Sequence, residues 1–224
     1  MNDKVINKKS FLSQVTEIVK TNIRNIIILL CLCFVLFLSF QIYSFYISNK
    51  IQKNSISFFS AQNSDDKNVI TDTITKLSDD NTFYGILAKL ELIDINLKQN
   101  NIQDSISMYL DLINKNNLDA VYKSAIASKA SYQLIDINLK DLSLDYLNII
   151  NEFISYIDDS SDSYNGIKLE LNYLIKILEA EKNSIDYSSF NELNDIYETM
   201  MNSDVASSAI KERVNKIHEF YSNK

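Results

Sequence analysis

The sequence predicts an all-α protein in which one N-terminal transmembrane helix precedes a domain of repeated helical hairpins. Three observations predict this fold: a charge-free apolar run at residues 26–47, apolar side chains that recur every three or four positions afterwards, and a chain with no proline and two glycines. Proline and glycine interrupt helices, so their scarcity suits long helices with short connections. It argues against a β-sandwich, which needs many turns.

The apolar run reads IIILLCLCFVLFLSFQIYSFYI and carries no charge over its 22 positions. A helix of this length spans roughly 33 Å, enough to cross a hydrocarbon core of about 30 Å. We therefore expect a bilayer to surround it. The side chains expected to form the transmembrane surface are Ile26, Ile27, Leu29, Leu30, Leu32, Phe34, Val35, Leu36, Phe37, Leu38, Phe40, Ile42 and Ile47.

The flanking charges predict the orientation of this helix. The basic residues before the run are Lys4, Lys8, Lys9, Lys20 and Arg24, and those close behind it are Lys50 and Lys53. Lysine and arginine accumulate on the cytoplasmic side, so we expect a cytoplasmic segment at residues 1–25 and an exported domain at residues 48–224. A cleavable signal peptide is the alternative, but its apolar region is about 7–15 residues and ends in small residues. Because Gln41, Tyr43 and Phe45 stand there instead, a permanent signal anchor is favoured.

Charge and cysteine content exclude several classes of function. The whole chain has a formal net charge of −7. Residues 1–47 contribute +3, so residues 48–224 carry a net charge of −10. An acidic exported domain repels nucleic acid, which we do not expect as a partner. Both cysteines, Cys31 and Cys33, lie in the apolar run and point in different directions on a helix. The exported domain has no cysteine for a disulfide or a thiolate metal site.

An internal repeat organises the exported domain. The heptapeptide LIDINLK occurs at Leu92–Lys98 and again at Leu134–Lys140, 42 positions later. Helical apolar spacing surrounds both copies, and each is followed by a second stripe of the same period, which predicts stacked helical hairpins. The residues expected to pack the repeats are Gly85, Ile86, Ala88, Leu90, Ile93, Leu97, Ile106, Tyr109, Ala127, Ala130, Tyr132, Ile135, Leu139, Tyr146 and Ile149.

Further stripes extend this pattern on both sides. The transmembrane helix is expected to continue over residues 44–63, and a short helix to follow at residues 69–77. The second helix of the second pair is expected to carry Leu142, Tyr146, Ile149 and Phe153. A third, weaker pair is expected to start at Ile167 and to continue with a stripe from Phe190 to Met200, and a last helix to span Ile210 to Tyr221. The links at residues 99–101 and 140–141 are short enough to make neighbouring helices antiparallel.

No constellation of side chains predicts catalysis. The single histidine, His218, is expected on a solvated helix face, and the acidic run at residues 158–163 is interpreted as a turn and helix start instead of a calcium loop. Motifs for nucleophilic, zinc-dependent or phosphate-binding chemistry are missing from the sequence. Most tyrosines and phenylalanines lie at core spacing, although some could line a groove. We therefore predict a protein that is not an enzyme, with no cofactor, metal or small-molecule substrate.

The segment Asn81–Leu92, NTFYGILAKLEL, resembles the Tyr-Gly/Ala-x-Leu-Ala-x-Leu-x-Leu opening of the first full repeat in ancillary SecYEG translocon subunits (YfgM-like proteins). Asn101 and Ile102 stand where that family turns between the two helices of a repeat. Ser105 and Asp145 depart from it, because alanine is usual near there, and the repeat-ending proline is missing. The chain is also similar to an uncharacterised group from AT-rich intracellular alphaproteobacteria.

The resemblance implies a single N-terminal transmembrane helix followed by a tetratricopeptide-repeat-like (TPR-like) helical-hairpin repeat domain. It implies a single-pass protein of the bacterial inner membrane with a periplasmic domain, which acts in protein–protein interaction beside Sec translocon subunits or periplasmic chaperones on emerging proteins. The first helices of the pairs, residues 83–99 and 121–139, are expected to make the contact. The alternative is a structural scaffold or assembly factor of an envelope complex that self-associates through its last helix.

Overall fold

The computed structural model describes residues 3–115, 118–158 and 162–223. Over these residues every regular element is helical, so the all-α prediction is confirmed. The elements are α1 (Asp3–Gln62), α2 (Lys67–Ser78), α3 (Phe83–Lys98), α4 (Ile102–Ile113), α5 (Ala120–Lys140), α6 (Leu147–Ser155), α7 (Asp162–Asn183), the 3-10 helix η1 (Tyr187–Ser189), α8 (Asn191–Asn202) and α9 (Ser208–Ser222). Contacts between residues divide the chain into two compact units, Met1–Ala88 and Lys89–Lys224.

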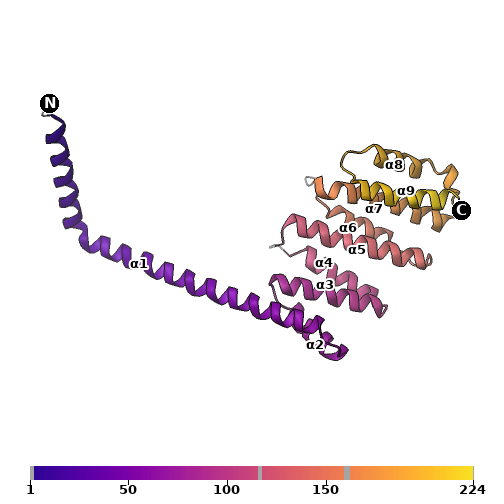
Figure 1. Cartoon of the computed structure of the whole chain (residues 1–224), viewed down its shortest axis with the longest axis horizontal. Coiled ribbons are helices and arrows are strands. Elements are labelled where there is room, and N and C mark those ends of the chain that lie inside the picture. The colour runs from indigo at the N-terminus through magenta and orange to yellow at the C-terminus, as the bar shows by residue number, and fades with distance from the viewer. Residues whose placement is uncertain (1–2, 116–117, 159–161, 224) are drawn as a thin grey trace. The chain divides into compact units, whose positions relative to one another are not determined.

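The first unit is dominated by α1, which continues through residue 47 without a break (Figure 1). The helix therefore continues past the end of the apolar run, as the sequence predicted, and only the amino-acid composition changes at residue 47. Among the described residues, α1 is the one helix long and apolar enough to cross a membrane. Its large apolar side chains from Ile26 to Ile42 are 36–70% exposed, so they form no core with the other residues that the structure describes.

The end of α1 packs against α2. Phe58 of α1 and Ile74 of α2 are both buried in the contact between these helices. A salt bridge of 2.9 Å joins Lys50 to Asp80, and Asn54 donates a hydrogen bond of 3.0 Å to the Thr82 hydroxyl. Apolar burial and these polar contacts hold α1, α2 and the turn before α3 together.

Gly85 allows the chain to turn sharply between α2 and α3. A Cβ atom at this position would lie 2.0 Å from the backbone oxygen of Asp80 and 3.0 Å from that of Leu77. Real Cβ atoms do not approach a carbonyl oxygen so closely, so any other residue would push the turn away. The sequence predicted that Gly85 packs the repeats, and the segment that packs closely against it is the end of α2 with its following turn.

The second unit is a stack of antiparallel helices. Figure 1 shows α4 to α9 lying beside one another, largely in chain order. Helix α5 packs against α4, α6 and α7, and α7 packs in turn against α6, α8 and α9. The core around α7 consists of Tyr173, Ile177, Leu193, Met200, Ala206 and Val214. Each hairpin thus buries its apolar faces against the next one, as expected for stacked pairs.

Two helices begin later than the apolar spacing predicts. Helix α6 begins at Leu147, so Leu142 and Tyr146 lie in the link before it, and this part of the prediction is wrong. Asn138 causes the difference, because its side chain accepts a hydrogen bond of 3.0 Å from the Tyr146 backbone N–H. Helix α8 begins at Asn191, with Phe190 at its N-cap. Of the acidic run, residues 159–161 lie outside the described part of the chain.

Candidate partner-binding groove

A groove of about 440 Å³ lies between α3 and α5 in the second unit. We refer to it as the α3–α5 groove. The residues that line it are Asp94, Leu97, Lys98, Gln133, Asp136, Ile137 and Lys140. All of them except Gln133 belong to the two copies of LIDINLK. The repeated heptapeptide therefore forms both walls of the groove.

Helical geometry explains why the repeat produces matching walls. At 3.6 residues per turn, neighbouring positions of the heptapeptide point to different sides of the helix. Ile93 and its counterpart Ile135 point into the core, where both are buried. Asp94 and Asp136, one position further on, line the groove instead. The same seven residues thus supply the core with isoleucine and the groove with a carboxylate.

A hydrogen-bonded network fixes one side of the groove. The two carboxylate oxygens of Asp94 accept bonds from Lys129 Nζ at 2.7 Å and from Gln133 Nε2 at 2.8 Å. The Gln133 side-chain oxygen accepts in turn from the hydroxyl of Tyr109 on α4. Burial, helped by the charge of Asp94, raises the pKa of Tyr109, so this hydroxyl stays a donor. The network joins α3, α4 and α5 at the groove.

The opposite side of the groove is open to solvent. Asp136 pairs with Lys140 at 2.5 Å, and both side chains are more than 60% exposed. Lys98 has no ion-pair partner among the residues that the structure describes, and Leu97 and Ile137 are half-buried beside it. The groove therefore offers two apolar side chains and an unpaired ammonium group. This combination suits an apolar side chain with a carboxylate nearby.

The residues predicted to pack the repeats fall into two groups. The buried ones are Gly85, Ala88, Ile93, Ile106, Tyr109, Ala127, Ala130 and Ile135. The half-buried ones are Ile86, Leu90, Leu97, Tyr132, Leu139, Tyr146 and Ile149. Leu97 is the member of this set that lines the groove, where it keeps part of its surface accessible.

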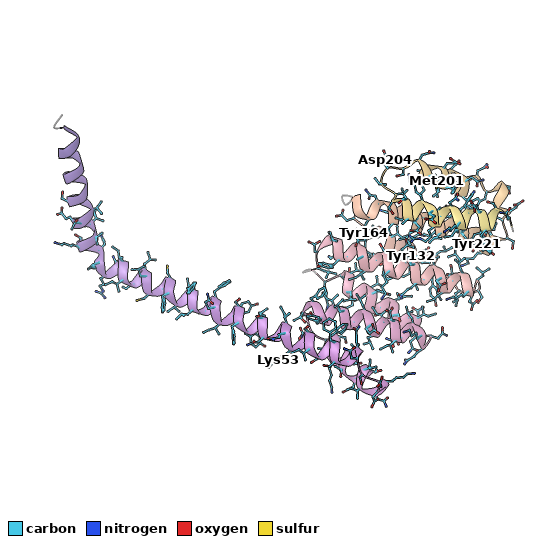
Figure 2. The ribbon with its side chains drawn as sticks, viewed as in Figure 1. Lys53, Tyr132, Tyr164, Met201, Asp204 and Tyr221 are labelled. Atoms are coloured by element: carbon cyan, nitrogen blue, oxygen red, sulfur yellow. The ribbon has the colours of Figure 1, made fainter. Side chains whose placement is uncertain are left out.

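A buried glutamate joins α5, α7 and α9 of the second unit, and the apolar periodicity of the sequence did not predict this contact. Glu170 of α7 is 1% exposed, and its two carboxylate oxygens accept bonds of 2.5 Å from Arg213 of α9. Tyr132 of α5, labelled in Figure 2, donates a further bond of 2.6 Å to Glu170. A buried carboxylate needs such partners, because burial without them strongly disfavours its charge. The one sequence signal is a glutamate next to Leu171 in an apolar stripe.

His218 lies in an aromatic cluster, so the prediction of a solvated histidine is wrong. Its ring stacks on Tyr197 with centroids 3.9 Å apart, and its Nδ1 lies 3.1 Å from the Tyr173 hydroxyl. Burial lowers the pKa of His218, although the carboxylates of Glu198 and Glu219 oppose this shift. Within the described part of the chain, no three His, Cys, Asp or Glu side chains gather as they would around a metal ion.

No protein-family model, curated protein or solved structure matches this chain. The assignment of a function consequently depends on the geometry of the described residues.

Proposed function

We propose that this protein is a membrane-anchored protein–protein interaction module on the periplasmic side of the inner membrane. It assists the Sec translocon or periplasmic chaperones with emerging proteins, and its helical pairs act as TPR-like repeats. Helix α1 holds the module at the membrane with its N-terminus in the cytoplasm, and the α3–α5 groove binds the partner.

One observation carries the proposal. The two first helices that the sequence predicted to contact a partner, α3 and α5, form the two walls of a groove, and the repeated heptapeptide lines it. Three features support binding there: solvent access, part-exposed apolar side chains, and a polar network that holds the walls in place. Preorganised walls lower the conformational entropy lost on binding.

The chemistry of the groove defines the segment that it binds. Leu97 and Ile137 accommodate an apolar side chain, and Lys98 attracts an acidic residue or a carboxylate close to it. The second unit is itself acidic, so Lys98 supplies a local positive charge on a negative surface. A partner segment with apolar and acidic residues in succession fits this surface.

Photo-crosslinking from the full-length protein in native envelopes tests the proposal. A photoreactive amino acid at Ile137 should capture translocon subunits or periplasmic chaperones. The same amino acid at Gln103, which is exposed on α4 away from the groove, should capture much less. Charge reversal by Lys98→Glu should weaken capture from Ile137 several-fold. Equal capture from the two positions, or proteins of neither class, would count against the function.

A scaffold or assembly factor of an envelope complex is the second candidate. Phe220 favours it, because this side chain is 66% exposed on the last helix. Self-association through α9 would bury the ring. Sedimentation of the full-length protein in detergent would then depend on protein concentration, and Phe220→Ser should weaken that dependence. A concentration-independent wild type would remove this candidate.

A further inference from the structure

The apolar run of α1 contains a single carboxamide, Gln41. It lies six residues before Ile47, so it is about 9 Å inside that end of the run. The side chain of Gln41 makes no hydrogen bond to any residue that the structure describes. In a bilayer, an amide with two donor hydrogens and one acceptor oxygen would therefore face hydrocarbon without a partner.

Gln41 does not bond to its own helix as the nearby serine does. The hydroxyl of Ser39 donates a bond of 2.8 Å to the backbone oxygen of Val35, one turn earlier in the same helix. Gln41 also cannot reach the nearer membrane surface easily. Side chains on a helix lean towards its N-terminus, which at this position points them to the middle of the bilayer.

We propose that α1 pairs with α1 of a second copy of this chain, in parallel, through Gln41. The proposal rests on the membrane anchoring in the proposed function. A carboxamide complements itself, since it both donates and accepts, and equal positions of two parallel identical helices lie at the same depth. Each Gln41 then supplies the partner that the other lacks.

The residues around Gln41 form a seam suited to such a pair. The positions 34, 37, 41, 44 and 48 alternate in steps of three and four, the spacing that keeps one face of a helix turned to a partner. Phe34 and Phe37 lie on this face on one side of Gln41, and Ser44 and Ser48 on the other. Ser44, like Gln41, has no hydrogen-bond partner among the described residues, and its small side chain allows close approach of the helices.

Disulfide crosslinking of the full-length protein in lipid vesicles tests the pairing. The chain has two cysteines, so Cys31→Ala with Cys33→Ala gives a cysteine-free background. In it, Phe34→Cys, Phe37→Cys and Ser44→Cys should form disulfide-linked dimers readily. Val35→Cys and Leu36→Cys, which lie off the seam, should form few. Uniform crosslinking at all five positions would overturn the proposal.

Matched variants then isolate the carboxamide. In the Phe37→Cys protein, Gln41→Leu should weaken dimer association roughly three- to thirty-fold, the range of one or two interhelical hydrogen bonds in membranes. Ser39→Ala should leave association unchanged, because the Ser39 hydroxyl is already bonded within its helix. Gln41→Asn should retain most of the association. An unchanged Gln41→Leu protein would overturn the proposal.

The outcomes also separate the pairing from the anchor. A protein that resists alkaline carbonate extraction but forms no dimer retains its anchor and refutes the pairing. Crosslinks from position 37 to the helix of a different protein, in place of a second copy, likewise refute it. A protein that carbonate releases from the membrane refutes the anchor, and the pairing with it.

Discussion

The first hairpin pair, α3 and α4, and the second, α5 and α6, show how one repeated sequence serves two different connections. Both first helices end in LIDINLK, at Lys98 and at Lys140. The first link then takes residues 99–101, whereas the second takes residues 141–146. Asn100 turns the first link quickly, with a φ of 63° in the left-handed region that asparagine tolerates. The heptapeptide determines where the first helix ends, and the residues after it determine how the chain returns.

The same asparagine of the repeat illustrates this division. Asn96 of the first copy is half-buried and donates to the sulfur of Met108 at 3.4 Å, a weak acceptor. Its counterpart Asn138 is fully buried, donates to the Leu144 backbone oxygen and accepts from the Tyr146 N–H, both at 3.0 Å. The same asparagine thus makes a weak contact in the first pair, whereas in the second pair it holds the link between the two helices.

The largest expected effect comes from a contact that the second pair has and the first lacks. Tyr132, whose counterpart in the first copy is Leu90, bonds to the buried carboxylate of Glu170, which also pairs with the half-exposed Arg213. Arg213→Ala should lower the free energy of unfolding by about 3 kcal/mol, because it leaves a buried carboxylate without its cation. Urea unfolding of the full-length protein in detergent, followed by circular dichroism, measures the change.

Lys216→Ala on the same helix is the control for this variant. Lys216 pairs with Glu212, and both side chains are mostly exposed, so its loss should cost less than about 1 kcal/mol. Equal losses of stability for Arg213→Ala and Lys216→Ala would show that the ion pair of Glu170 stabilises the protein no more than an exposed surface pair does.

Asn138→Ala compares the two copies of the repeat directly. It should cost about 2 kcal/mol, since the Tyr146 N–H then loses its partner inside the protein. Asn96→Ala, the same change in the first copy, should cost less than about 1 kcal/mol. The same urea unfolding measurement applies. If both variants lost equal stability, the second link would not depend on Asn138.

The paired aspartates of the α3–α5 groove provide a third comparison. Asp94 connects α3 to Lys129 and Gln133 of α5, so Asp94→Ala should cost about 1 kcal/mol. Among the residues that the structure describes, Asp136 pairs with Lys140 alone, one turn away on the same exposed helix face, and Asp136→Ala should cost about 0.5 kcal/mol or less. Hydrogen exchange of the α3 amides should accelerate in the Asp94 variant alone. Equal acceleration in both would place the connection elsewhere.

Much of the fold follows from apolar period alone. The all-α class, the long apolar helix, and helices close to α2, α3, α4, α5, α7 and α9 can be predicted from side chains spaced every three or four residues. Periodicity fails where a polar side chain sets the helix start. Leu142 and Tyr146 continue the stripe of α6, yet they stay in the link, where Asn138 donates to the Leu144 backbone oxygen and accepts from the Tyr146 N–H. The energy that decides this boundary comes from residues eight positions apart on different elements.

The candidate groove could be predicted only in part. The internal repeat predicted that the first helices contact a partner, but it predicted no groove between them, and one copy of LIDINLK cannot show that Ile93 points inward while Asp94 faces the groove. That assignment needs the relative rotation of two packed helices. The Glu170–Arg213 pair could not be predicted for the same reason, because 43 residues separate its two members in the sequence.

The smallest expected effect concerns the cluster of Tyr173, Tyr197 and His218, which has no counterpart around the first hairpin. Burial holds the pKa of His218 below its ordinary value of about 6.5, so the folded protein favours the neutral ring. As the pH falls below about 6.5, the unfolded chain takes up a proton that the folded protein resists, and the stability of the second unit should decrease. Urea midpoints at pH 7.5 and pH 5.5, compared with the same midpoints for His218→Phe, isolate this contribution. The phenylalanine retains a ring against Tyr197 but cannot titrate, so its midpoint should shift less over this interval. Equal shifts in the two proteins would assign the acid sensitivity to the carboxylates and leave His218 a packing role alone.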